Sequence, residues 1–319
     1  MASRATRSAS RAAAVVATGP LGALSHDELG VIVDGLADPL QPVVAVALSS
    51  TCLGLRTPLQ AALEVLQQRH ERATALCRKL RDSSTWLYRP HGYKVMRFVP
   101  MTCVLLRDAD IVELHSTTWN HQSLTTDDVA TLAMILRTNG LPKMQRLNLK
   151  GNDLGDAGVQ ALSEEFGNGA APSLRYLVLT QSNVGPVGAE ALSAALRRGA
   201  LPKLTNLEIA RNPLGNQGVA TLAAPLRKLP ALTELSLDDC EIDDGGVASL
   251  VDNLGKDDFQ SLQYLWLEGN KITDAGITKI AAAIRAGGLP KMRRHTSMFG
   301  RTSVSASAVQ AVWDLLAWR

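Results

Sequence analysis

Aromatic side chains and cysteines are scarce in this sequence. Only 4% of its 319 residues are aromatic, so a core must be built mainly from the aliphatic residues that dominate its 46% hydrophobic content. The cysteines are Cys52, Cys77, Cys103 and Cys240. They form no C-x-x-C pair and have no histidine cluster beside them, which argues against a zinc site or a disulfide framework. We therefore expect free thiols, no metal and no cofactor.

The chain also lacks long apolar runs, a strong charge bias and familiar catalytic motifs. No apolar run approaches the roughly 18 residues of a transmembrane helix. The net charge is only +3, too small to indicate nucleic acid or a membrane surface as a partner. Neither a glycine-rich phosphate loop nor a G-x-S-x-G or H-E-x-x-H motif occurs. We predict a protein that is not an enzyme and that binds neither nucleic acid nor a membrane.

Acidic residues do not occur among the first 26 residues, which contain Arg4, Arg7 and Arg11 among many Ala and Ser. This composition fits a disordered tail and equally a targeting segment for an organelle. Both interpretations stay open for residues 1–22. We expect the protein in the cytoplasm or the nucleus unless this segment directs its import into an organelle.

The chain does contain an internal repeat, which is the strongest guide to its fold. Five segments follow the pattern L-x-x-L-x-L-x-x-N-x-L and continue with a second apolar set. They begin at Met144, Leu174, Leu204, Leu232 and Leu262. The successive starts are 30, 30, 28 and 30 residues apart, so the pattern indicates a row of similar folding units.

The first half of each repeat predicts a short strand with one buried face. Its fourth and sixth positions are apolar and alternate with mostly polar neighbours, which is the period of a strand. The fourth positions are Leu147, Leu177, Leu207, Leu235 and Leu265. The ninth positions are Asn152, Ser182, Asn212, Cys240 and Asn270. A buried amide there can donate to and accept from the backbone of the turn, and we interpret Cys240 as a structural substitute.

The second half of each repeat predicts a helix. Apolar residues recur at positions 16, 19 and 23, which lie on one helical face. The residues expected to cap the helix N-termini are Asp156, Asn216, Asp244 and Asp274, with Pro186 at this place in the second repeat. A Gly follows two residues later in every repeat, and we expect it to let the helix pack closely on the strand.

This strand–turn–helix pattern resembles the leucine-rich repeat of the ribonuclease-inhibitor type over residues 105–319. The resemblance implies an α/β fold, namely a horseshoe-shaped solenoid with a parallel sheet inside and helices outside. We expect about seven units, of which five, from 144 to 291, are well formed. A degenerate first unit has its strand near Ile111–Leu114.

The last unit, which begins at Met292, departs from the pattern. His295 and Ser297 stand where the repeat should have buried leucines. We expect Trp313 and Trp318 to help close the open end of the core.

Residues 23–104 form a predicted α-helical region before the repeats. Segment 24–56 resembles an F-box: Leu-Ser-x-Asp-Glu-Leu, a helix, Asp-Pro-Leu, and a second helix that ends at Cys52, without the usual Trp three residues later. The resemblance implies docking to a Skp1-type adaptor, and a plain helical cap on the first repeat is the alternative. A long helix over about residues 58–81 follows, with an apolar seam expected to pack on neighbouring helices.

The horseshoe places the third, fifth and seventh strand positions on its concave face. This face is basic near Arg146 and Lys150 and acidic towards the later repeats. An exposed Trp among charges is typical of a binding hot spot, although Trp266 could instead pack on Tyr264 and its neighbours. We predict that a protein partner binds Glu208, Glu234, Asp238, Tyr264, Trp266 and Glu268.

These features favour a binding module over an enzyme. The F-box resemblance implies a substrate receptor of an SCF-type ubiquitin ligase. Ran-type GTPase-activating proteins are similar in architecture, so a regulator of a small GTPase is the alternative. A blocker like the ribonuclease inhibitor is a third class, and the concave charge suits a basic target only at its acidic end.

Overall fold

A computed structural model describes residues 56–82, 111–113, 124–139, 141–295 and 298–317 of the chain. Residues 1–22, nearly all of the F-box-like segment, Ser297 and Trp318 lie outside these described residues. The expectations for them, and the predicted domain boundaries, therefore stay predictions.

Six short strands form one parallel sheet in chain order. They are β1 (Ile111–Glu113), β2 (Arg146–Asn148), β3 (Tyr176–Val178), β4 (Asn206–Glu208), β5 (Glu234–Ser236) and β6 (Tyr264–Trp266). The fourth-position leucines of the five good repeats are paired across β2 to β6 and are all buried. The predicted strands, including the one at Ile111, are confirmed.

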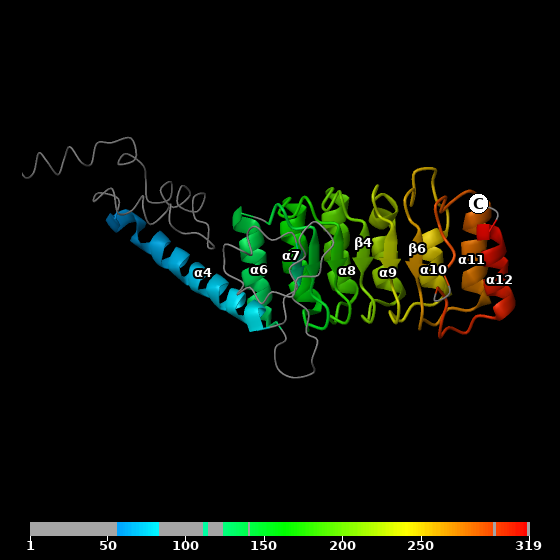
Figure 1. Ribbon diagram of the computed structural model, residues 1–319, viewed down its shortest axis with the longest axis horizontal. Helices are drawn as coiled ribbons and strands as arrows, with labels where there is room; N and C mark the ends of the chain where they lie inside the picture. The colour runs from blue at the N-terminus through cyan, green and yellow to red at the C-terminus, as the bar shows by residue number, and fades with distance from the viewer. Residues whose placement is uncertain (1–55, 83–110, 114–123, 140, 296–297, 318–319) are drawn as a thin grey trace, which may run out of the picture.

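A helix follows every strand, so each unit returns the chain to the start of the next strand. The helices are α6 (Thr126–Asn139), α7 (Gly155–Gly167), α8 (Pro186–Arg197), α9 (Gly215–Arg227), α10 (Asp244–Val251), α11 (Asp274–Arg285) and α12 (Ala306–Ala317). They lie side by side in chain order (Figure 1). Because helices pack about 8–10 Å apart and strands only about 4.8 Å apart, the sheet must line the inner side of the curve. The fold is the predicted leucine-rich-repeat solenoid.

Helix α4 (Arg56–Asp82) packs against α6 at the first end of the array, where Figure 1 shows it running obliquely away from the row of helices. Leu66, Ala73, Leu76 and Cys77 are its buried apolar residues among those whose side chains are described. The expectation that this helix packs on a neighbour is therefore confirmed. The seam predicted from the sequence did not include Leu76; it consisted of Leu59, Leu63, Leu66, His70, Ala73, Cys77 and Leu80.

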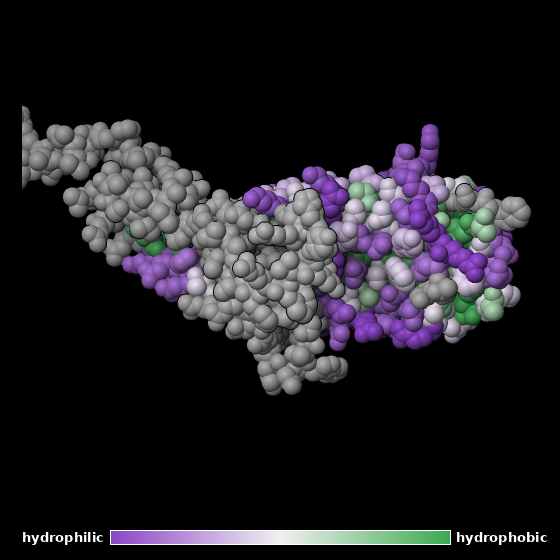
Figure 2. Space-filling model, in the orientation of Figure 1, coloured by the Kyte–Doolittle hydropathy of each residue, from purple (hydrophilic) through white to green (hydrophobic). Residues whose placement is uncertain are grey.

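One continuous core runs from Ala73 of α4 to Val312 of α12. It is mainly aliphatic, and each fully buried Leu, Ile or Val contributes roughly 1.5–3 kcal/mol. On the face seen in Figure 2, hydrophilic residues predominate among the described residues, and hydrophobic ones gather near the C-terminal end. No helix of the described residues is long and apolar enough to cross a membrane.

The buried amides at the ninth position connect neighbouring repeats. Asn212 Oδ1 accepts from the backbone N–H groups of Ser182 and Val184 at 2.9 and 3.0 Å. Its Nδ2 donates to the carbonyls of Leu179 and Ile209, both at 2.7 Å. Asn270 bonds the preceding repeat in the same way. The prediction of a bond to the turn is confirmed, and the amide also holds the turn of the unit before it.

The predicted N-caps act on a different helix from the one expected. Asp244 lies inside α10, and its Oδ1 accepts from the N–H groups of Thr273 and Gly276 at the start of α11, at 2.9 and 3.0 Å. Asp156 and Asn216 cap α8 and α10 in the same manner, and Asp274 accepts from the N–H of Ser305, directly before α12. The expectation that each caps its own helix is wrong, because each helix begins one or two residues earlier than the pattern suggests.

The glycines after these residues make room for the cross-repeat caps. A Cβ on Gly276 would lie 2.4 Å from Asp244 Oδ1, and one on Gly246 would lie 2.7 Å from Asn216 Oδ1. The expected close approach is therefore to the preceding helix and not to the strand. The second repeat has Pro186 in place of the capping Asp or Asn. The helix that such a residue would cap, α9, begins at Gly215, whose φ is +57°.

We predict that Asp244→Ala lowers the free energy of unfolding by about 1 kcal/mol, the usual effect of removing an N-cap side chain. Asp244→Asn should cost much less, because Asn216 performs the same task one repeat earlier through its amide oxygen. Urea unfolding followed by circular dichroism measures both. Equal losses in the two variants would contradict a cap made through Oδ1.

Candidate functional site

The six predicted partner-binding residues lie on β4, β5 and β6 or directly after them, all partly exposed. The structure divides them into three groups. Glu208, Asp238 and Glu268 line one cavity. Tyr264 and Trp266 surround a histidine, and Glu234, which pairs with Tyr264 on the neighbouring strand, accepts a hydrogen bond from Asn206.

The cavity has a volume of about 260 Å³ and lies where the strands end. Its charged lining residues are Glu208, Asp238, Asp239 and Glu268 with Lys150, Arg211 and Arg301. The acidic end of the concave face thus carries its own cations. Sequence reasoning placed Lys150 on this face and missed Arg211 and Arg301.

Arg301 joins two acidic residues that belong to different repeats. Its Nε donates to Glu268 Oε1 and its Nη2 to Asp239 Oδ2, both at 2.8 Å. Asp239 also lies 3.7 Å from Arg211. The contact passes over Gly269, where a Cβ would collide with Asp239. The missing side chain of Gly269 therefore allows Arg301 to reach the unit beyond its neighbour.

A shift in register explains why Arg301 was missed. In the good repeats, the N–H of the sixth position donates to the fifth position of the next unit, which is 29 residues later where the units start 30 residues apart, as from Leu237 to Trp266. In the last unit, the N–H of Leu267 donates to Met298, which is 31 positions later. Because of the two extra residues, Arg301 takes the place that Arg211 and Asp239 occupy in their own repeats. It also has their left-handed backbone conformation, with φ 52°.

His295 fills the space beside the two aromatic residues of β6. Its ring centroid lies 4.2 Å from that of Trp266 and 5.9 Å from that of Tyr264. Its Nε2 lies 3.0 Å from the Leu265 carbonyl oxygen, which fixes the ring against the strand. Trp266 is therefore covered on one side by His295, an alternative that the sequence analysis did not include. Although His295 stands at a leucine position, it is only half-buried and does not belong to the apolar core.

Burial changes the acidity of two groups at this site. Burial lowers the pKa of His295 below its ordinary value, partly offset by its bond to Leu265, so its neutral form is favoured. Burial raises the pKa of Asp238, although hydrogen bonds from the Glu268 N–H and the Ser236 hydroxyl favour its charged form.

Several other residues expected to face the concave side are buried. Asn148, Val178, Thr180, Asn206 and Ala210 have 9% or less of their surface exposed. Arg146 lies over the ring of Tyr176 at 5.5 Å, so the basic end is also packed by its own side chains. The accessible part of this face is therefore smaller than the sequence analysis predicted, and it is concentrated on β5 and β6, where the residues expected to face the concave side are all partly exposed.

Cys240 has a structural place, as predicted. Its thiol is buried and lies 3.3 Å from the carbonyl oxygens of Ile209 and Asp238. Burial raises its pKa to about 12, so it is a protonated thiol and a poor nucleophile. Trp313, which was expected to close the core, is only partly buried, while Met298 and Phe299 cover the end of the core unexpectedly. Within the described residues, no three His, Cys, Asp or Glu side chains are grouped to hold a metal ion.

Five segments of the chain match the family described as Leucine Rich repeat. They are residues 140–163, 170–193, 200–223, 228–251 and 260–281. Each segment spans one strand and most of the helix that follows it, in agreement with the units of the structure. Repeats of this family generally mediate protein–protein interaction. No match was found among curated proteins.

We predict that His295 makes the protein less stable in mild acid. Because its pKa in the folded state is lowered, the unfolded chain binds a proton first as the pH falls below about 6.5. The stability that neutral His295 contributes is thus fully present above that pH. It is lost as the pH falls through the pKa that His295 has in the folded protein. His295→Gln keeps a donor for the Leu265 carbonyl and does not titrate. The unfolding free energy of this variant should depend less on pH between about 7.5 and about 5.5. Identical pH profiles for the two proteins would remove His295 as the cause.

Proposed function

We propose that this leucine-rich-repeat chain is a non-catalytic protein-binding module whose partner docks on the concave side of β4 to β6. The six residues that would carry the interaction are Glu208, Glu234, Asp238, Tyr264, Trp266 and Glu268. The arrangement of Tyr264 and Trp266 around His295, beside the acidic cavity, is the observation that supports this most directly.

A protein suits this surface better than a small molecule. The cavity is lined by residues of successive units from Lys150 to Arg301, and the aromatic pair lies beside it, since Trp266 pairs with the lining residue Ser236. An occupant that covers both features therefore extends over several repeats. Half-buried aromatic residues surrounded by charged groups are typical of the centre of a protein interface. Because β4 to β6 are held by the core behind them, this surface needs little ordering before it binds.

The charges favour a partner that is basic or carries aromatic groups. Arg301 pairs with Glu268 and Asp239, whereas the side chains that donate to Asp238 and Glu234 are the uncharged Ser236 and Asn206. A basic side chain of the partner would approach Glu234 and Asp238. Arg301 would meanwhile limit repulsion among the acids when no partner is bound.

At the finer level, we propose a substrate receptor of an SCF-type ubiquitin ligase, in which segment 24–56 would contact a Skp1-type adaptor. This rests on the F-box-like sequence, which lies almost wholly outside the described residues. The alternative is a regulator of a small GTPase of the Ran type, which rests on the shared repeat architecture alone. Co-purification with a Skp1-type adaptor tests the first role, and a GTP-hydrolysis assay with Ran-like proteins tests the second. The expected location is the cytoplasm or the nucleus.

We predict that Trp266→Ala weakens partner binding by about 2 kcal/mol or more, which is roughly thirtyfold in Kd. Quantitative pull-down with the full chain, read by mass spectrometry, identifies the proteins that are retained. Isothermal titration with the identified partner then gives the affinity. Circular dichroism establishes that the variant stays folded.

Tyr176 and Tyr264 provide a matched control, since they occupy the same strand position on β3 and on β6, three strands apart. Tyr264→Ala should weaken the same partner, whereas Tyr176→Ala should leave its affinity unchanged. A partner that is retained equally by Trp266→Ala and the unaltered chain would remove this site from the proposal.

A further inference from the structure

A basic strip lies at the C-terminal end of the array, separate from the acidic cavity. It borders a pocket of about 360 Å³ lined by Gln263, Pro290, Lys291, Met292, Arg293, Arg294 and Leu316. Among the described residues, the lining contains three cations and no acidic side chain. All three cations are exposed, and none forms an ion pair with another residue that the structure describes.

The backbone beneath these cations is firmly held. The N–H of Arg293 donates to the Gln263 carbonyl at 2.8 Å, and Met292 between the cations is buried in the core. The guanidinium of Arg294 lies 4.2 Å from the centre of the Trp313 ring, a cation–π contact that restricts its position. The cations are therefore held on an ordered scaffold, which lowers the entropy lost on binding.

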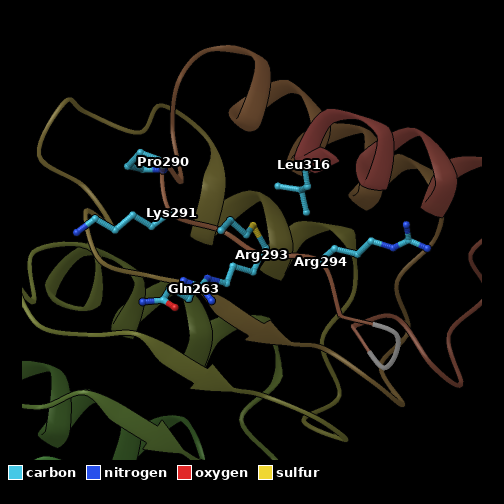
Figure 3. A pocket seen from close by; sticks show the side chains of 7 residues that line it. Gln263, Pro290, Lys291, Arg293, Arg294 and Leu316 are labelled. Atoms are coloured by element: carbon cyan, nitrogen blue, oxygen red, sulfur yellow. The ribbon is translucent and has the colours of Figure 1, made fainter. Parts of the chain in front are cut away.

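The cations are spread along the strip and do not surround one point. Figure 3 shows Arg293 beside Gln263 near the centre, with Lys291 extending to one side and Arg294 to the other. Such spacing suits several negative groups along an extended chain better than a single small anion. Leu316 of α12 and Pro290 add apolar surface at the edge of the pocket.

We propose that this strip binds an acidic peptide segment of a partner protein, with Lys291 and Arg293 contacting its carboxylates. A peptide is favoured over a nucleic acid because the helix-to-strand loop of the preceding unit, between α10 and β6, carries Asp252 and the exposed Asp257, which would repel a long polyanion continuing along this edge of the array. The proposal does not depend on the concave site, so either could fail without the other.

Fluorescence anisotropy of the full chain with a fluorescein-labelled Glu-rich peptide tests this directly. The peptide should bind, its counterpart with Gln for every Glu should not, and added salt should weaken binding because the contacts are exposed. In the double variant Lys291→Gln/Arg293→Gln, Kd should rise about three- to tenfold, as expected for the loss of two exposed charge pairs. Arg294 is left in place because its substitution would also remove the contact with Trp313.

The repeat supplies a matched control. Arg175 and Lys203 are exposed and occupy the positions of Arg293 and Lys291 in earlier units, so Arg175→Gln/Lys203→Gln makes the same charge change elsewhere. This control and Trp266→Ala should both retain the affinity of the unaltered chain. The proposal is overturned if the peptide does not bind, if the control loses as much affinity as the strip variant, or if the affinity is lost in Trp266→Ala alone. Tighter binding of a single-stranded oligonucleotide, lost in the strip variant, would identify nucleic acid as the occupant and also overturn it.

Discussion

The array depends on hydrogen bonds that buried turn groups can make only with an adjoining repeat. A backbone N–H that is shielded from water must find a partner or destabilise the fold by about 1–3 kcal/mol. The turn that follows β3 directs two such groups to Asn212, which belongs to the next unit. The helix N-termini follow the opposite rule, since Asp156 and Asp244 reach forward from the preceding unit. Each repeat therefore both completes its neighbours and is completed by them.

This arrangement separates structural positions from positions that are available for recognition. The leucines, the ninth-position side chains and the capping residues are fixed by packing and by buried hydrogen bonds. On β5 and β6 the third, fifth and seventh positions are only partly buried, so they can hold Tyr264, Trp266 and Glu268 outside the apolar core. Binding in this fold should therefore depend on these side chains, and replacing them should change the affinity for a partner more than the free energy of unfolding.

The repeating part of the fold could be predicted because it depends on local periodicity. Apolar residues such as Leu147 and Leu265 identified the strands and their buried face correctly. The direction of the Asp244 cap could not be predicted, because the pattern gives neither the first residue of a helix nor the distance to the neighbouring helix. Arg301 was missed because the two extra residues of the last unit break the periodicity that assigns positions. His295 was identified as an exception, but its packing on Trp266 is a tertiary contact that no spacing indicates.

The reach of Arg301 over Gly269 has a mechanical consequence for the whole array. The terminal unit of a solenoid has only one neighbour, so it is usually the first to fray. Here the guanidinium of Arg301 in the last unit binds carboxylates of the two units before it. These contacts connect three units, and they pass over Gly269. The end of the array that carries the aromatic pair is therefore braced where a repeat protein is ordinarily weakest. A force that a bound partner exerts on this end would therefore act on three connected units together, and the last unit would not unfold separately from the two before it.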